Sequence, residues 1–291
     1  MTVATRARKR VVAAIDGADL SARVLASAAA AAPMFDASVE AVHVFETARA
    51  AARARHVAAA AGVTLDVITG PVLARLTAHV MSRDVAVVVI GASTGPRPDQ
   101  PMGRHALALI TAARRPMIVV PVDAVVPIAL HRMLVPLDAS PMTREALHDA
   151  VELARAVDVE LIALHVHSYH ALPMFTDQPQ HEVPAWSDEF LRRYWPGSTP
   201  FPTLQHRVGV PADEIIRTVE ETGADLLVLA WSQNLSPGRS RVVGRALRES
   251  RTPVLLLPSR RQPTAVDDVE LSGLAQPEGA AAGVEVGFVK R

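Results

Sequence analysis

The sequence contains an internal repeat, and this repeat limits the possible folds more than any other feature. The stretch KRVVAAIDGADLSARVLASA is matched later by HRMLVPLDASPMTREALHDA, so that Asp16 corresponds to Asp138, 122 residues further on. Towards the ends of the two copies, VAVVVIGAS with Gly91 corresponds to ADLLVLAWS with Ala230, 139 residues further on. Matches that keep one order at nearly constant spacing indicate a duplicated domain of about 130 residues.

The spacing between matching residues also locates the domain boundaries. It is 122 between His43 and His165 but 139 between Gly70 and Gly209, so the second copy carries an insertion at 168–203. The end of the chain loses all hydrophobic periodicity, which is typical of a disordered tail. The predicted organisation is a basic disordered start (1–8), a first domain (9–122), a linker (123–130), a second domain (131–258) that contains the insertion, and a disordered tail (259–291).

Each copy alternates two kinds of segment. Ala-rich stretches of helical character separate short apolar runs, which in the first copy are Val11–Ile15, Val39–Val44, Leu65–Ile68, Val85–Ile90 and Met117–Val120. Unbroken apolar runs suit strands covered on both faces, and their alternation with helices predicts a parallel, doubly wound α/β sheet. Such sheets bind ligands at the carboxyl ends of their strands, where the strand order switches. Asp16, Asp138 and the loop after Gly91 all fall at such ends.

The composition excludes several classes of partner. The formal net charge is zero, which argues against nucleic acid as a general partner. The chain has no cysteine, so disulfides and thiolate metal sites are excluded. No run approaches the roughly 18 apolar residues of a membrane span, and no apolar stretch of signal-peptide type follows the basic start. We therefore expect a cytoplasmic protein without membrane association.

Several segments carry a family resemblance. LVPLDAS, ALHVH, GVPADEIIRTVEETGADLLVLA and GRALRESRTPVLLLP resemble the universal stress protein family, and the first copy resembles it more loosely. The resemblance implies two tandem five-stranded parallel sheets of the adenine nucleotide alpha hydrolase type. It also implies an intramolecular pseudo-dimer that pairs through the last strands, Met117–Val120 and Val254–Leu257. Some family members bind ATP, and the family is linked to survival under stress rather than to a defined reaction.

The nucleotide-binding members of that family carry a glycine, a second glycine three residues on, and later a Gly–Ser or Gly–Thr pair. The glycines let backbone N–H groups approach phosphates, and the hydroxyl donates a hydrogen bond to them. In the first copy Gly91 is kept, but Thr94 replaces the second glycine and Arg104 follows Gly103. The second copy has Ala230 and Gln233 at the two early positions, and Arg245 follows Gly244. Both loops are therefore degenerate phosphate loops, and the first keeps more Gly, Ser and Thr.

Two hypotheses remain for each of these positions. Arg104 and Arg245 either replace the lost hydroxyls as phosphate ligands or make salt bridges on a helix surface. In the family, the aspartate after the first strand lies near adenine and ribose, but an N-cap of the next helix also explains it. The valines of the second strand either offer backbone to the base or are ordinary core. The predicted nucleotide-binding residues are Asp16, Val44, Gly91, Ser93, Gly95, Gly103 and Arg104 in the first copy, and Asp138, Val166, Ser232, Gly244 and Arg245 in the second.

The insertion 168–203 holds seven of the eleven aromatic residues of the chain, together with six prolines. It suits a lid over a ligand, a docking surface for a protein partner, or an extra helix packed on its own domain. Just before it, HVHSYH places His165 and His167 on one face of a strand, a pattern that zinc or nickel can use. Because His165 matches His43 of the other copy, we interpret it as a framework residue and predict no metal site. Mg²⁺ is expected only together with bound ATP.

The leading functional hypothesis is a stress-response module that senses a small ligand or binds a partner, the ligand being ATP or another adenine nucleotide. The alternative is a scaffold whose nucleotide clefts no longer function. A weak nucleotide hydrolase ranks below both, because the sequence offers neither a convincing general base nor an acidic metal cluster. We therefore expect no enzymatic activity, and we expect homodimers besides the internal pseudo-dimer.

Overall fold

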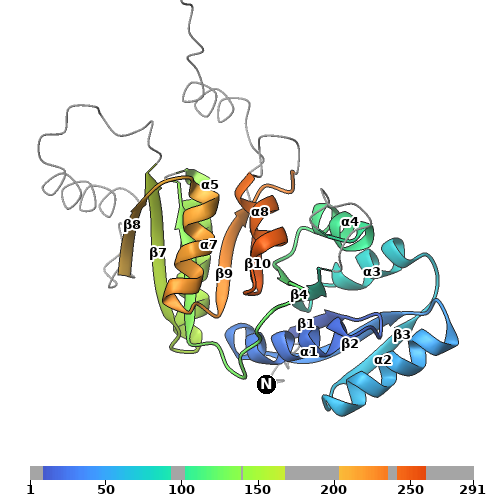
Figure 1. Ribbon diagram of the computed structural model, residues 1–291. Helices are drawn as coiled ribbons and strands as arrows, with labels where there is room; N and C mark the ends of the chain where they lie inside the picture. The colour runs from blue at the N-terminus through green and yellow to red at the C-terminus, as the bar shows by residue number, and fades with distance from the viewer. Residues whose placement is uncertain (1–8, 93–101, 139, 168–202, 235–240, 260–291) are drawn as a thin grey trace, which may run out of the picture. The chain divides into compact units, whose positions relative to one another are not determined.

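The computed structural model describes residues 9–92, 102–138, 140–167, 203–234 and 241–259 (Figure 1). The basic start, most of the first phosphate-loop region, and nearly all of the insertion and of the tail lie outside the described residues. Their predicted roles therefore stay predictions. Thr203, which we had placed in the insertion, begins a strand instead.

The first half alternates strands and helices as expected from its apolar runs. Its elements are β1 (Lys9–Ala14), α1 (Leu20–Ala31), the short 3-10 helix η1 (Ala32–Phe35), β2 (Ala37–Val44), α2 (Ala48–Ala60), β3 (Thr64–Ile68), α3 (Val72–Val80), β4 (Val85–Gly91), α4 (Arg104–Ala112) and β5 (Met117–Val120). All neighbouring strands of this half are parallel, in the order β3-β2-β1-β4-β5. The strands agree with the predicted runs to within two residues at either end.

The second half repeats this plan. Its elements are β6 (Arg132–Leu137), α5 (Pro141–Ala156), β7 (Glu160–His167), β8 (Thr203–Val208), α7 (Pro211–Thr222), β9 (Leu226–Trp231), α8 (Arg241–Glu249) and β10 (Val254–Pro258). The strand order is again that of the first half, β8-β7-β6-β9-β10. Proline occupies the first turn of α5 and of α7, where its missing N–H costs no helical hydrogen bond.

The two halves join through their last strands. β5 and β10 pair antiparallel, with Val119 opposite Val254 and Met117 opposite Leu256, which gives one ten-stranded sheet. The predicted α/β fold and the predicted pairing of last strands are both confirmed. The strands of each half are parallel to one another, but they run antiparallel to the strands of the other half. The carboxyl ends of the two sets of strands therefore point in opposite directions.

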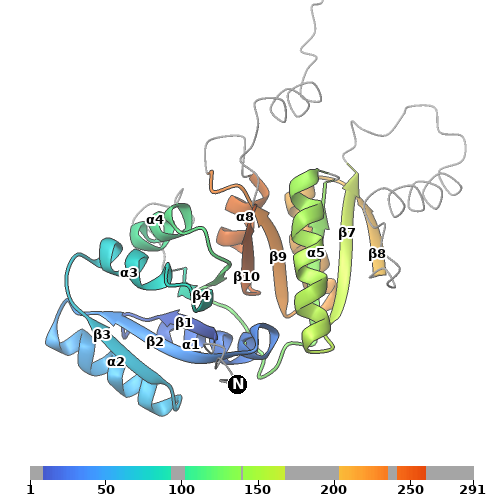
Figure 2. The same ribbon diagram turned by 180° about the vertical axis from the view of Figure 1, so that it is seen from behind.

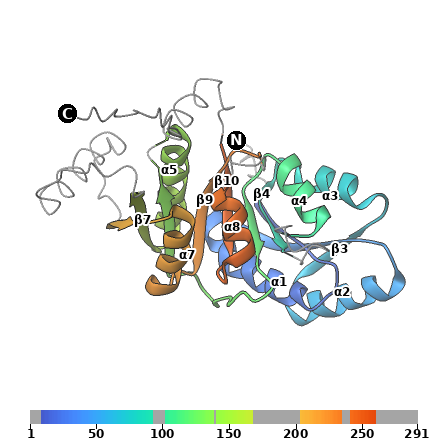
Figure 3. The ribbon, with the colours of Figure 1, turned by 45° about the horizontal axis from the view of Figure 1, so that its top comes forward.

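Helices cover both faces of this sheet, and a hydrophobic core lies under each layer. Figures 1 and 2 show α7 and α8 on one side of the second-half strands and α5 on the other, and Figure 3 shows α3 beside α4 and α7 beside α8. One core contains residues of α1, α2 and α5, and the other contains residues of α3, α4, α7 and α8. None of the helices in the described part of the chain combines the length and the apolar character that a membrane span requires.

Candidate functional site

The strand order places one candidate site in each half. In the first half the order switches between β1 and β4, whose ends pair as Ala14 with Ile90, and in the second half it switches between β6 and β9. Ligands of doubly wound sheets bind in the crevice outside the carboxyl ends at such a switch. Asp16 lies two residues after the end of β1, Asp138 directly follows β6, and Gly91 ends β4.

Asp16 shapes the turn between β1 and α1. Its Oδ1 accepts hydrogen bonds from the backbone N–H of Ala18 at 2.8 Å and from the Ser21 hydroxyl at 3.1 Å. The Ser21 oxygen in turn accepts from the N–H of Gly17 at 3.0 Å. The Asp16 side chain is exposed, and its Oδ2 has no hydrogen bond to a described residue. One oxygen therefore fixes the turn, and the other is left as an acceptor without a partner among the described residues.

The second half builds the same turn. Asp138 Oδ1 accepts from the N–H of Ser140 at 2.9 Å and from the Thr143 hydroxyl at 2.7 Å. The pairing of Ser21 with Thr143 in the repeat thus has a structural basis, since both hydroxyls donate to the aspartate five residues earlier. The N-cap interpretation of the two aspartates is wrong, because α1 begins after Asp19 and α5 is capped by the Ser140 side chain.

Gly91 and the start of α4 form the other side of the first site. A Cβ atom on Gly91 would lie 2.5 Å from Cδ2 of Leu20, so the Leu20 side chain of α1 would have to move if Gly91 were replaced. Gly103 precedes the first residue of α4, and the exposed Arg104 is that first residue. The positive end of the α4 dipole and the first-turn N–H groups therefore lie at the site, which favours an anion. Ser93 and Gly95 lie outside the described residues.

A surface groove of about 640 Å³ adjoins the Asp16 turn. It lies between the start of α1 and α2, and its lining includes Gly17, Asp19, Arg49, Arg53 and His56. Within the described residues neither arginine of this groove has an ion pair. The first half therefore presents unpaired cationic side chains beside its Asp16 turn.

The two predicted valines, Val44 and Val166, lie in or against the hydrophobic core. Val44 is buried at the end of β2, and Val166 packs against the core under α7 and α8. Their neighbours His43 and His165 hold the first strand of each half: His43 Nδ1 lies 2.9 Å from the Ile15 carbonyl, and His165 Nδ1 lies 2.8 Å from the Leu137 carbonyl. The structure thus brings both histidines into framework contacts, as the repeat had indicated.

The loop after β9 is engaged with the first half. The indole N–H of Trp231, which is 2% exposed, donates to the Ile110 carbonyl at 3.2 Å. The amide nitrogen of Gln233 donates to the Ala113 carbonyl at 2.9 Å, and Gln233 keeps a left-handed backbone with φ of 60°. Both acceptors lie at the carboxyl end of α4. Gln233, at the position of the lost second glycine, therefore binds the end of α4. The predicted Ser232 makes no hydrogen bond to a described residue.

The assumed equivalence of Gly244–Arg245 with Gly103–Arg104 is wrong. Gly244 and Arg245 lie in the middle of α8, and the first residue of that helix, the counterpart of Arg104, is Arg241. Arg245 makes ion pairs with Asp213 of α7 at 2.6 Å and with Glu249 at 2.9 Å. The salt-bridge alternative therefore describes Arg245, and the structure does not bring it to the β6/β9 switch.

Three histidines gather on β7 and β8. The ring centroids of His165 and His167 are 4.5 Å apart, those of His167 and His206 are 5.6 Å apart, and His167 Nε2 lies 3.3 Å from His206 Nδ1. Burial lowers the pKa of all three imidazoles. For His165 the pKa falls to about 4, through burial first and the neighbouring imidazoles after it, against the opposing effects of the Leu137 carbonyl and Asp138. The sequence indicated only the His165–His167 pair, because His206 arrives from another strand.

This cluster predicts acid sensitivity. Between pH 6.5, the ordinary pKa, and about pH 4, His165 is protonated in the unfolded chain but neutral in the folded chain. The free energy of unfolding therefore falls as the pH decreases through this window. At about pH 5 the expected loss is on the order of 2 kcal/mol for this residue. Urea unfolding near pH 7.5 and pH 5 measures it, and His165→Gln should flatten the difference. An unchanged pH dependence in that variant would contradict the assignment.

Residues 129–258 match the model of the universal stress protein family. Among solved structures, a universal stress protein from Archaeoglobus fulgidus DSM 4304 is 15% identical with a TM-score of 0.59, over 86% of this chain and 98% of that chain. A functionally unknown protein from Pseudomonas aeruginosa PAO1 is 14% identical with a TM-score of 0.61, over 92% of this chain and 96% of that chain.

These two structures share the fold across both halves, since each similarity extends over most of this chain. No relative is found among curated proteins. The family match covers β6 to β10 with their helices, which includes the Asp138 turn and the His165 contact. Residues 129–258 therefore form a domain of the universal stress protein family.

Proposed function

We propose that the protein is a nucleotide-sensing module that binds an adenine nucleotide such as ATP in its first half only. The observation that carries this proposal is the difference between the two switch points. In the first half, a groove lined by Arg49 and Arg53, which have no ion pair among the described residues, adjoins the Asp16 turn. In the second half, the last residue of β9, Trp231, and Gln233 in the loop after it contact α4 instead.

The chemistry of the first half suits the parts of a nucleotide. The exposed carboxylate of Asp16 accepts hydrogen bonds from ribose hydroxyls, and the α4 N-terminus with Arg104 attracts phosphate. We expect the nucleotide to be bound without turnover. The nucleotide then acts by stabilising the first half rather than by being consumed.

The two halves provide matched variants for the test. In the wild type, ATP at a hundredfold excess over its dissociation constant should stabilise the fold by about 2.7 kcal/mol, read as a higher melting temperature. Asp16→Asn keeps the oxygen that holds the turn but removes the charge, and we expect it and Arg104→Ala to weaken binding at least tenfold. Asp138→Asn and Arg241→Ala change the equivalent positions of the second half and should leave affinity unchanged.

Three results would contradict this proposal. If ATP, ADP and cyclic AMP all leave the melting temperature unchanged, the protein is a scaffold whose nucleotide clefts do not function. If Asp16→Asn and Asp138→Asn lower the affinity for nucleotide equally, both halves bind nucleotide. Release of ADP at a steady rate, abolished by Asp16→Asn, makes the protein a hydrolase instead of a sensor.

A further inference from the structure

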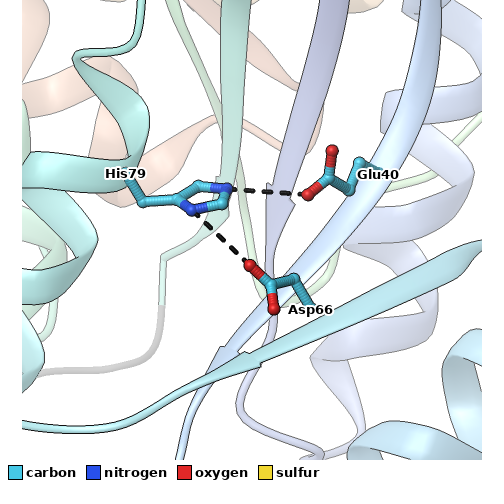
Figure 4. A group of neighbouring side chains, drawn as sticks. All are labelled: Glu40, Asp66 and His79. Carbon is cyan, nitrogen blue, oxygen red and sulfur yellow. Dashed lines mark ion pairs between the residues drawn. The ribbon is translucent and has the colours of Figure 1, made fainter.

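A group of possible metal ligands lies away from both switch points, between α3 and the edge of the sheet. Glu40 comes from β2, Asp66 from β3 and His79 from the last turn of α3, and one ligand atom from each lies within 4.8 Å of the others. Figure 4 shows one ring nitrogen of His79 turned towards Glu40 and the other towards Asp66. His79 Nε2 lies 3.7 Å from Glu40 Oε1, and His79 Nδ1 lies 3.8 Å from Asp66 Oδ2.

The strand register explains why these residues meet. Val42 is paired with Asp66, so Glu40 and Asp66 lie on the same face of neighbouring strands, the face that α3 covers. The side chains of Glu40 and His79 are only 20% and 15% exposed, and that of Asp66 is 48% exposed. Two carboxylates and an imidazole are thus held at the rim of the core.

The spacing leaves a place for an ion rather than for hydrogen bonds. Both nitrogen–oxygen distances exceed the range of a hydrogen bond. His79 Nε2 is buried and has no hydrogen-bond partner among the described residues. Ligand atoms about 2.1 Å from a tetrahedral zinc ion lie about 3.4 Å from each other, close to the gap between His79 Nε2 and Glu40 Oε1. Asp66 lies nearer to the other ring nitrogen, so its carboxylate must shift towards Nε2 to share the ion.

The surrounding charges also favour a cation. Arg10 pairs with the other oxygen of Glu40, Oε2, and with Asp84 at 2.7 Å. Its hydrogen bond lowers the pKa of Asp84 to about 2, so this carboxylate stays ionised. Together with Asp66, the group therefore has three carboxylates to one guanidinium, of which Glu40 and Asp84 contact it. The Arg10 contact fixes Glu40 while leaving Oε1 free to face His79.

We propose that Glu40, Asp66 and His79 bind one divalent transition-metal ion. Imidazole nitrogen with carboxylate oxygens is a donor set that suits Zn²⁺ and its neighbours better than Mg²⁺. The ion connects α3 to β2 and to the edge strand β3, and so fastens that edge of the first half. The site is independent of the nucleotide proposal, and its test uses no nucleotide.

The second half supplies an internal comparison. At the spacings of the repeat, the positions of Glu40, Asp66 and His79 are occupied by Ile162, Gln205 and Thr218. None of these offers a metal-binding carboxylate or imidazole. The cluster is thus a property of this sequence in the first half and not a consequence of the fold.

The test is titration of the chelator-treated full chain with ZnCl₂ by isothermal calorimetry, with MgCl₂ in parallel. We expect one zinc event that His79→Ala and Asp66→Asn each weaken at least tenfold, and no comparable magnesium event. His56→Ala removes an exposed histidine of α2 and should bind zinc like the wild type. Asp66→Asn is nearly isosteric at a half-exposed position, so it keeps the test valid if His79→Ala unfolds.

Zinc could instead bind to the imidazoles of β7 and β8, that is, to His165, His167 and His206. His167→Gln should leave the event of the first half intact. The proposal is overturned if His167→Gln abolishes zinc binding while His79→Ala and Asp66→Asn do not, or if the wild-type chain binds no zinc. A rise in melting temperature with zinc that disappears in Asp66→Asn supports it independently.

Discussion

Replacing Trp231 with alanine is expected to lower the free energy of unfolding by about 3–5 kcal/mol, because it leaves a large cavity in the core. Trp231 is one of the largest fully buried side chains, and it lies in the core shared with α4. Its indole also donates to Ile110 across the two halves. Chemical denaturation of wild type and variant, followed by circular dichroism, measures the loss.

Trp231→Phe separates packing from the hydrogen bond. It keeps most of the apolar volume but leaves the Ile110 carbonyl without the indole donor, so we expect a loss of only about 1–2 kcal/mol. Equal losses in the two variants would mean that the hydrogen bond, and not the packing of the indole, decides the stability of this contact. A loss below 1 kcal/mol in Trp231→Ala would contradict its central place in the core.

Gly17→Ala is expected to cost about 2–4 kcal/mol, from positive-φ strain together with a steric clash. Gly17 has φ of 79°, and a Cβ atom there would lie 2.8 Å from the Ala50 carbonyl oxygen and 2.9 Å from the Ala54 nitrogen. Both contacts are backbone atoms of α2, which cannot turn aside as a side chain can. The substitution should therefore shift α2 and with it the groove beside Asp16.

Gly62→Ala is the matched control. Gly62 has φ of 68°, but a Cβ atom there meets nothing within 4 Å. Its replacement should cost about 1 kcal/mol, from backbone strain alone. Thermal and urea unfolding of the two variants compare them directly, and a similar cost for both would show that α2 yields easily at Gly17.

Helix α4 connects the two switch points. Its first residue, Arg104, lies at the first-half site, and its last turns receive Trp231 and Gln233 from the second half. The geometry follows from the antiparallel pairing of β5 with β10, which sets the carboxyl edge of the second half near the end of α4. The residues that replace the family pattern at the end of β9 and in the loop after it therefore contribute to the contact between the two halves.

The repeat alone predicted much of this architecture. Apolar runs buried on both faces have few alternatives to parallel strands, and a duplicated sequence folds twice into the same unit. For the same reason the paired residues were informative: Asp16 with Asp138 and His43 with His165 make the same contacts in each half. These contacts join segments that lie close in the sequence or on neighbouring strands, so a linear comparison can find them.

Tertiary structure decided the rest, because the remaining contacts join distant segments. Gly–Arg pairs that look alike in the sequence fall at different turns of α4 and α8, and Arg245 consequently pairs with Asp213 on another helix. Glu40, Asp66 and His79 carry no motif, and only strand register and helix packing bring them together. Local pattern determines which segments become strands and helices, whereas the chemistry of a site depends on which side chains the packed sheet makes neighbours.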